Sequence, residues 1–346
     1  MRMSWRGWKE WRRVVGLLRA LEHCLVPGEW WLQGSLAWLP AGAEGEPDAC
    51  QQHLRDTLLP GQDGPVRPLA HVTIRADGGE QSFDTLIARG DWTLLVERSR
   101  NRVLRVTRDV ERVQRLLENA RWLSSAYRCP QLEPALGLPA GFAGVSESFV
   151  EGTPIREAPE TVWESAYRDL LRMCGVHARR WEGRLDPDPV RQELDRWTLP
   201  HWLSRAVEGH RSRWEPLLQG CPLLASHADC HNGNVFVLPD GSVTLIDLER
   251  VQSVPFFFDA LSLLRGSAAV NQSLRRDFLA GRFDTALAEV WAAAGQTWDP
   301  EGREGALLAM ALAHAFRPQF AGASSRKRRE KFIGACEKLR ADCGWE

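Results

Sequence analysis

The 346-residue sequence has little of what marks exported, membrane-spanning or zinc-binding proteins. No apolar run approaches the ~20 residues of a membrane-spanning helix. Charged residues interrupt the apolar residues of the first segment, MRMSWRGWKEWRRVV, unlike the core of a signal peptide. The eight cysteines are scattered, without a Cys-x-x-Cys pair or a dense Cys/His spacing, which favours reduced thiols over a zinc site or disulfides. We therefore expect a cytoplasmic protein.

The sequence also has almost no net charge. Lys and Arg number 44 against 45 Asp and Glu, which leaves a formal charge of -1. This balance removes the global electrostatic case for a nucleic-acid-binding protein, and we expect no nucleic-acid partner. With 44% hydrophobic and 26% charged residues, the composition is that of a globular protein. The length favours two domains or lobes over a single core.

The N-terminal segment predicts an amphipathic helix over residues 4–24. Its apolar positions recur at helical spacing, and arginines are interleaved with them: Trp5, Trp8, Trp11, Val15 and Leu18. Such a helix either packs on its own protein with solvated arginines or lies on an anionic membrane surface as a peripheral contact. Residues 39–66 are rich in Gly, Pro, Asp and Gln, which indicates loops. We assign residues 1–70 to a helical extension and linker.

The rest of the chain predicts an α+β protein with two lobes. Short strand patterns at 71–76, 82–88, 92–97 and 102–107 are separated by tight turns, which indicates an antiparallel sheet. A helix is expected over 109–126, and a further strand lies within 144–152. We assign residues 71–152 to a β-rich N-terminal lobe. Residues 153–346 read as a helical C-terminal lobe, interrupted by a hairpin whose turn contains Gly241.

Polar side chains gather around this hairpin. The segment HADCHNGN places His227, Asp229 and Asn234 in the spacing H-x-D-x-x-x-x-N, and Asp247 ends the strand VTLID. Transfer of a phosphoryl group needs a residue that orients the attacking hydroxyl and oxygen ligands for Mg²⁺. Carboxylates and an amide at this spacing supply both, so the segment predicts a phosphotransferase site.

The segment resembles the catalytic loop of the kinase-like phosphotransferase superfamily, in particular its aminoglycoside phosphotransferase and choline kinase branch. LIDLE similarly resembles the metal-binding element of that branch. The resemblance implies a two-lobed protein-kinase-like fold that uses ATP and Mg²⁺. It makes Asp229 the catalytic base, His227 a support for the loop, and Asn234 and Asp247 the Mg²⁺ ligands. Asp259 in FFFDALSLL would brace the loop.

The resemblance extends into the N-terminal lobe. Arg105 would take the place of the lysine that contacts the nucleotide phosphates in protein kinases, and Glu118, or else Glu111, would hold it in an ion pair. In SESFVEGTPI, Glu147 begins the segment that would pass the adenine. A full glycine-rich phosphate loop is absent from the sequence, and Gly90 alone occupies the corresponding turn.

The acceptor is left open by the sequence. A long helical insert separates His177 from His227, as in small-molecule kinases, so we expect the acceptor to be a hydroxyl of a sugar, amino alcohol or aminoglycoside-like molecule. LIDLERVQ also resembles lipopolysaccharide core sugar kinases, which implies an alternative acceptor at the inner face of the membrane. A catalytically weak nucleotide-binding regulator is the third reading. His231 either reaches the substrate or stabilises its turn, and Cys230 has no general-base partner that would make it a nucleophile.

Overall fold

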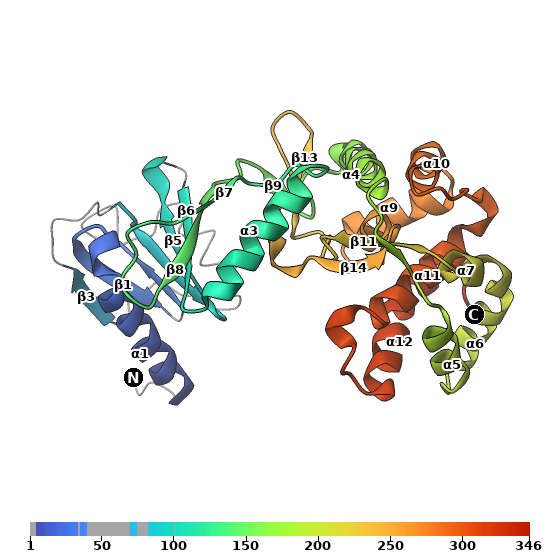
Figure 1. The fold of residues 1–346 in the computed structure, drawn as a ribbon, viewed down its shortest axis with the longest axis horizontal. Coiled ribbons are helices and arrows are strands. Elements are labelled where there is room, and N and C mark those ends of the chain that lie inside the picture. The colour runs from blue at the N-terminus through green and yellow to red at the C-terminus, as the bar shows by residue number, and fades with distance from the viewer. Residues whose placement is uncertain (1–4, 34, 40–69, 75–81, 101) are drawn as a thin grey trace. The chain divides into compact units, whose positions relative to one another are not determined.

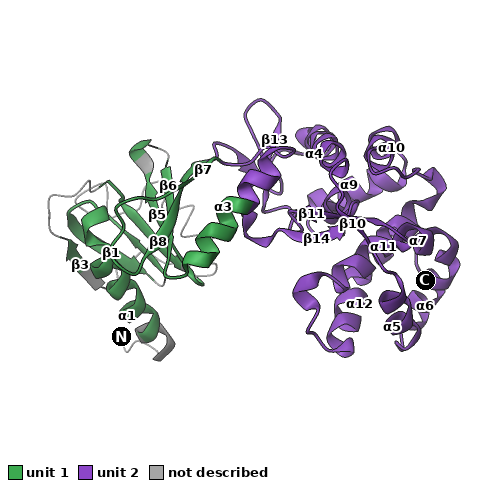
Figure 2. Ribbon diagram, viewed as in Figure 1, with its two compact units in different colours: residues 1–118, 131–149 green, residues 119–130, 150–346 purple. Residues whose placement is uncertain are grey.

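The computed structural model describes residues 5–33, 35–39, 70–74, 82–100 and 102–346 (Figure 1). The chain forms two compact units (Figure 2). Unit 1 comprises residues 1–118 and 131–149, and unit 2 comprises residues 119–130 and 150–346. Most of the predicted linker, and the end of the strand expected at 71–76, lie outside the described residues.

Unit 1 is built on one antiparallel sheet with the strand order β3-β1-β2-β4-β5-β6-β8-β7. The strands are β1 (Gly28–Gln33), β2 (Leu36–Trp38), β3 (Ala70–Ile74), β4 (Thr85–Arg89), β5 (Trp92–Glu97), β6 (Arg102–Thr107), β7 (Leu132–Pro134) and β8 (Ala143–Ser148). The four strand patterns between residues 71 and 107 are confirmed as β3 to β6. Strands β1 and β2 were not predicted, although the buried Trp30 and Leu32 follow the alternation of a strand.

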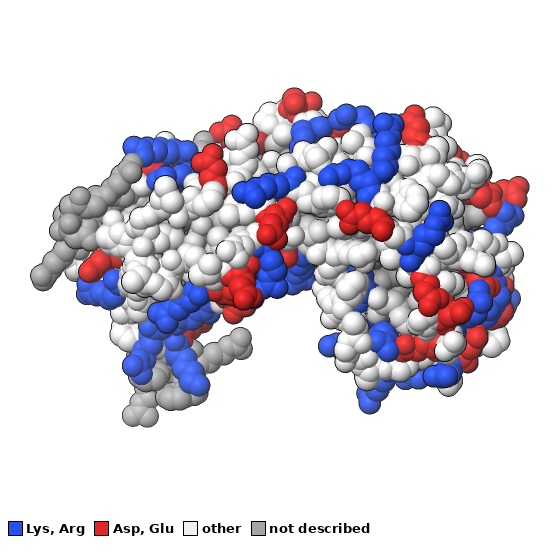
Figure 3. Space-filling model, viewed as in Figure 1, with Lys and Arg blue, Asp and Glu red and all other residues white. Residues whose placement is uncertain are grey.

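Helix α1 (Trp5–Ala20) covers one face of this sheet. Val14 and Leu18 are fully buried in a cluster with Trp30, Leu86 and Leu95 from the strands. Arg12, Arg13 and Arg19 of this helix are exposed, and Figure 3 shows basic side chains over the helix. The apolar face from Trp11 onward is therefore occupied by the protein's own sheet, while the side chains of the first tryptophans lie outside the described residues.

Helix α3 (Val110–Ser124) follows β6, within the range expected for it. Its start is capped by Asp109, whose carboxylate accepts the backbone N–H of Arg112 at 3.1 Å. Val113, Leu116 and Leu123 form the buried side of the helix. The helix leads from the sheet of unit 1 into the first residues of unit 2.

Unit 2 is mainly helical. Its helices are α4 (Trp163–Ala178), α5 (Asp188–Asp195), α6 (His201–Gly209), α7 (Arg211–Leu218), α8 (Phe258–Ser262), α9 (Ala269–Leu279), α10 (Asp284–Ala293), α11 (Arg303–Ala315) and α12 (Ser325–Cys343). Helix α11 is buried along its length from Gly305, as the central helix of this core. None of the helices that the structure describes is long and apolar enough to cross a membrane.

Two small sheets lie among these helices. One has the order β10-β11-β14 and the other β13-β12-β9. Their strands are β9 (Thr153–Pro154), β10 (Gly183–Arg184), β11 (Pro222–Ser226), β12 (Val235–Val237), β13 (Val243–Leu245) and β14 (Gln252–Pro255). The predicted hairpin is β12–β13, and Gly241 adopts the positive φ of +81° that its turn requires. The α+β class, with a β-rich N-terminal and a helical C-terminal lobe, is confirmed.

Candidate functional site

The predicted catalytic loop, residues 227–234, connects β11 to β12 in unit 2. Its first turn is held by Asp259, which is 1% exposed. The two carboxylate oxygens of Asp259 accept the backbone N–H groups of His227 at 3.0 Å and Ala228 at 2.9 Å. Ala228 has a φ of +56°, a conformation that costs energy for a residue with a side chain. Asp259 thus stabilises a strained turn immediately before Asp229.

His227 ties this loop to the neighbouring hairpin. Its Nε2 lies 2.8 Å from the carbonyl oxygen of Ile246, and its Nδ1 accepts the backbone N–H of Asp229 at 3.3 Å. The ring is 1% exposed. These contacts place the proton on Nε2 and leave no free nitrogen for proton transfer, so the geometry suits a structural support better than a base.

Asn234 and Asp247 meet across the β12–β13 hairpin. The backbone N–H of Ile246 donates to the carbonyl of Asn234 at 3.0 Å, which places Asp247 one residue beyond that pair. The side-chain amide of Asn234 donates to the backbone carbonyl of Asp229 at 3.1 Å. Asp229 itself keeps a side chain that is 15% exposed. The structure therefore brings the three predicted residues of the loop and hairpin into one place.

The donor set fits a magnesium ion that is completed by substrate. Among the described residues, no group of three or more His, Cys, Asp or Glu side chains is arranged to hold a metal. Mg²⁺ is commonly held by one or two protein oxygens, with water and substrate phosphates supplying the remainder. The side-chain nitrogen of Asn234 donates to the Asp229 carbonyl, so the amide oxygen of Asn234 can serve as a metal ligand together with the carboxylate of Asp247. Asp247 lies in the left-handed region with φ +63°.

Arginines surround Asp229, and the sequence analysis did not identify them. Arg250 Nη1 lies 3.6 Å from an Asp229 carboxylate oxygen, and Arg317 donates to the carbonyl of Ala228. Burial lowers the pKa of Arg265, while the Asp229 carboxylate acts in the opposite direction. Only Arg250, in LERVQ, is near the motif in sequence. The others come from later helical segments, so no local pattern indicated them.

Two further residues of the loop have defined roles. His231 Nδ1 accepts the backbone N–H of Gly233 at 3.0 Å, so it stabilises the turn, and its exposed ring also lines a pocket. Cys230 is fully buried, and burial raises the pKa of its thiol well above the ordinary value. A buried, protonated thiol is a poor nucleophile, in agreement with the prediction for Cys230.

Buried polar residues support the loop from behind. The Tyr127 hydroxyl donates to Asp259 at 3.3 Å, and burial raises the pKa of that hydroxyl well above its ordinary value. His177 is fully buried, with Nε2 3.1 Å from the carbonyl of Ala225 in β11. Burial lowers the pKa of His177, which keeps its imidazole neutral. The His177 contact holds β11 just before the loop, and the Tyr127 contact holds Asp259, which binds the first turn of the loop.

In unit 1, Arg105 is held by a different glutamate from the one predicted. Arg105 Nε donates to Glu147 at 2.5 Å and Nη2 at 3.4 Å, and both side chains are largely buried. The prediction named Glu118, or Glu111, on helix α3, but both of these side chains are exposed. The sheet register gives the reason, because Glu147 is opposite Val103, which shares a face with Arg105.

The strand order also places Glu147 inside the sheet. Strand β8 lies between β6 and β7, with Glu147 opposite Val103 on one side and Leu132 on the other. Because Glu147 is paired on both sides, its strand has no free edge at this residue for the predicted adenine contact. Only the residues that follow β8, beginning with Phe149, are outside the ladder.

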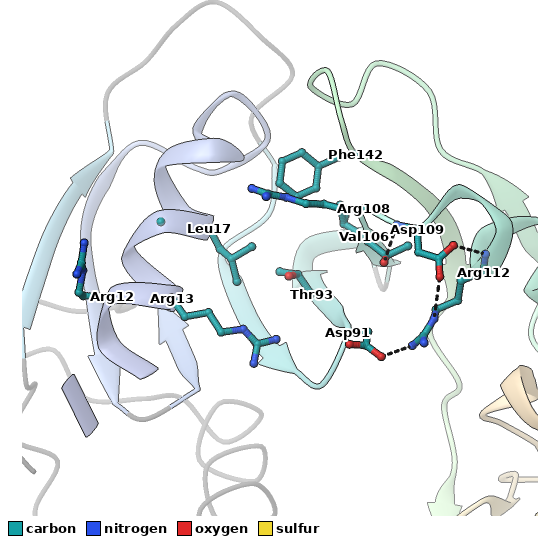
Figure 4. Close-up of a pocket in the computed structure, with 12 residues that line it drawn as sticks. Arg12, Arg13, Leu17, Asp91, Thr93, Val106, Arg108, Asp109, Arg112 and Phe142 are labelled. Carbon is teal, nitrogen blue, oxygen red and sulfur yellow. Dashed lines mark hydrogen bonds and ion pairs between the residues drawn. The ribbon is translucent and has the colours of Figure 1, made fainter. Parts of the chain in front are cut away.

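Gly90 occupies the β4–β5 turn and has a φ of +56°, which favours glycine. Its carbonyl accepts a hydrogen bond from Arg13 of helix α1. Beside this turn lies a pocket of about 710 Å³ with several arginines in its lining, and Asp91 pairs with Arg112 there at 2.9 Å (Figure 4). Val106 also lines the pocket, so Arg105 faces the opposite side of the sheet. This pocket is therefore separate from the predicted phosphate contact.

Comparisons with known proteins identify the family of the chain. The model of the phosphotransferase enzyme family matches residues 73–304, more than half of the chain, including Arg105, the catalytic loop and Asp247. No curated protein sequence is a significant match.

Solved structures with a similar fold include the aminoglycoside phosphotransferase APH(4)-Ia, with 15% identity, a TM-score of 0.46 and coverage of 74% of this chain and 92% of that chain. An aminoglycoside phosphotransferase from Alicyclobacillus acidocaldarius is 18% identical, with a TM-score of 0.39 and coverage of 83% and 97%. The Plasmodium vivax ethanolamine kinase is 10% identical, with a TM-score of 0.37 and coverage of 75% and 81%.

Proposed function

Because the chain belongs to the phosphotransferase enzyme family, we propose that it transfers the γ-phosphate of ATP to a hydroxyl group of a small molecule, with Mg²⁺ as cofactor. One observation carries this proposal. Asp229 lies at the end of a turn that Asp259 fixes through two backbone N–H groups, next to the oxygen-bearing side chains of Asn234 and Asp247. The proposed site of action is the cytoplasm.

Asp229 orients the acceptor hydroxyl and takes its proton. The freed oxygen forms a bond to the γ-phosphorus, the bond between that phosphorus and the β–γ bridging oxygen breaks, and ADP leaves with the electron pair. The protein supplies little covalent chemistry in such a transfer, so positioning and electrostatics dominate. The hydrogen bond from Asn234 to the Asp229 backbone fixes the position of the base.

Asn234 and Asp247 would hold Mg²⁺, which neutralises charge on the phosphates when bound. Arg105 would donate to the phosphates of the nucleotide. Its guanidinium is oriented by the carboxylate of Glu147, which accepts from Nε.

The test is Mg²⁺-dependent ATP consumption by the purified protein with choline, glucose, kanamycin and a heptose-containing glycolipid as acceptors. Asp229→Asn should lower the turnover by ~10²-fold or more, with ATP affinity nearly unchanged, since loss of a general base removes 10²–10⁴-fold. Asp247→Asn should also weaken Mg·ATP binding. Asp240→Asn, in the exposed hairpin turn, is the matched control and should behave as wild type.

The outcomes of this assay distinguish the small-molecule kinase from the lipopolysaccharide sugar kinase and from the nucleotide-binding regulator. Turnover with the glycolipid alone would favour the lipopolysaccharide sugar kinase reading. Mg·ATP binding without turnover in any form of the protein would favour the regulator. Full activity in Asp229→Asn would refute the assignment of the base.

A further inference from the structure

A pocket of about 270 Å³ lies in unit 2 beside the catalytic loop. His231 and Asn232 of the loop form one wall, residues 265–268 and Asn271 a second, and Lys338 of helix α12 a third. Two of its lining residues are cations, and none is an aspartate or glutamate. At ~30 Å³ for each water, the volume equals about nine waters, enough for a small polar group.

Among the described residues, no carboxylate forms an ion pair with Arg265, although the Asp229 carboxylate is close enough to favour its charged form. Arg265 Nη1 donates to a neutral acceptor, His314 Nε2, at 2.8 Å, and its Nε is buried without a hydrogen-bond partner. Within the described part of the chain, no carboxylate lies within ion-pair distance of Arg265 or of the nearby Arg317. Burying a guanidinium without a direct ion pair is costly. An anion in the pocket would remove that cost.

His314, which accepts the hydrogen bond from Arg265, does not compensate the charge of the guanidinium. Burial lowers the pKa of His314 to about 2, with Arg265, Arg317, Lys331 and Lys338 acting in the same direction. Burial, followed by Arg265, lowers the pKa of Arg317 to about 10. At neutral pH the histidine is therefore an uncharged acceptor while Arg317 keeps its charge. Several cations therefore lie around His314, and the carboxylate of Asp229 opposes their effect on Arg265 and Arg317.

The segment that carries Arg265 is rigidly held. Arg275, 1% exposed, donates to the carbonyls of Leu264 at 2.6 Å and Gly266 at 3.1 Å, and it pairs with Asp342 of helix α12. A Cβ on Gly266 would lie 2.2 Å from the Asn271 side chain, so only glycine permits this close approach. The guanidinium is therefore positioned before any ligand arrives, which lowers the cost of binding.

We propose that the acceptor is an anionic alcohol, a hydroxyl compound that carries a phosphate or carboxylate group, and that Arg265 and Lys338 bind this group beside Asp229. The proposal rests on the proposed function and specifies its substrate class. Lys338 and Arg317 lie beyond residue 304, where the match to the family ends. The contribution of Lys338 to this specificity therefore comes from outside the shared region, whereas Arg265 lies within it.

The test measures binding separately from transfer. Calorimetry at low ionic strength gives the Kd of glycerol 3-phosphate, glycerate, glycerol and choline for the full-length protein. We expect the two anions to bind at least tenfold more tightly than glycerol or choline, and the two anions together distinguish phosphate from carboxylate. Lys338→Gln should weaken anion binding about fivefold, and Lys338→Glu should abolish the preference. Lys327→Gln, on the same helix outside the pocket, is the matched control.

Arg265→Gln should remove the preference most completely, and the exposed Lys338 variants serve if that change disturbs folding. Equal binding of anionic, neutral and cationic probes would overturn the proposal, as would anion binding that Lys338→Glu leaves unchanged. A transfer assay with the same probes keeps the two claims apart. Charge-dependent binding without transfer would contradict the proposed function alone, whereas transfer to choline in preference to the anions would contradict this inference alone.

Discussion

The contact between Asp259 and the catalytic loop allows a quantitative prediction. One carboxylate accepts two buried backbone N–H groups, from His227 at 3.0 Å and Ala228 at 2.9 Å. Asp259→Asn keeps the size of the side chain but has one acceptor oxygen. Its NH₂ group would then face one of the two N–H donors. The substitution therefore leaves a buried backbone donor unpaired and removes the negative charge from the other hydrogen bond.

The magnitude follows from these losses. A hydrogen bond to a charged group contributes ~1.5–3 kcal/mol, and an unpaired buried donor costs ~1–3 kcal/mol. We expect the free energy of unfolding of unit 2 to fall by about 3 kcal/mol. At a slope of ~3 kcal/mol per molar urea, the unfolding midpoint should fall by about 1 M. Because the turn carries Asp229, turnover should fall as well, while the KM for ATP should change little.

The assay is urea unfolding followed by tryptophan fluorescence, with kcat and KM measured on the same preparations. Asp240→Asn is the control, since its carboxylate accepts only from Ser242 in an exposed turn and the amide oxygen can replace it. We expect no measurable shift in that variant. If Asp259→Asn unfolds at the wild-type midpoint with wild-type kcat, the bracing role of Asp259 is refuted.

Two further predictions concern buried charge in unit 2. His314 has a pKa lowered to about 2 by burial, so below pH ~6.5 the unfolded chain takes up a proton that the folded protein does not. As the pH decreases below that value, the free energy of unfolding should therefore fall more steeply in wild type than in His314→Gln, by ~1.4 kcal/mol for each pH unit. Urea titrations of both proteins at pH 7.5, 6 and 5 measure this difference. Parallel pH curves for the two proteins would contradict this. Asp342→Ala leaves the guanidinium of Arg275 buried without its partner and should cost ~3–5 kcal/mol in urea unfolding. The double variant Arg275→Met/Asp342→Leu should cost less, and a milder effect of the single change would refute the reasoning.

Much of the candidate site was predictable because its signals are local. The hairpin between residues 235 and 245 alternates apolar residues around a Gly turn, and its register alone brings Asn234 and Asp247 together. Strands β5 and β6 were also predicted with their observed limits, since tight turns bound both. A period of two and a turn residue are enough to specify such elements.

The partner of Arg105 was not predictable in the same way. In sequence, Glu118 is near and follows the strand on a helix, whereas Glu147 is remote. The choice depends on β8 lying next to β6, which is set by the return of the chain after α3. The arginines around Asp229 were missed for a similar reason. Arg265 and Arg317 reach the loop through helix packing in unit 2, and no spacing in the sequence encodes that packing.

The spacing of the motif has a physical basis in backbone strain. Among the residues that the structure describes, the non-glycine residues with positive φ are Ala228 and Asp247, and each adjoins a proposed catalytic group or is one. Such conformations cost ~1–3 kcal/mol each and persist only where neighbouring contacts enforce them. Asp259 binds the backbone N–H of Ala228 directly, and His227 contacts the residue next to each strained position, Asp229 on its own loop and Ile246 on the hairpin. From its position two residues before Asp229, one ring therefore ties the proposed base to Ile246, the residue before the proposed metal ligand Asp247.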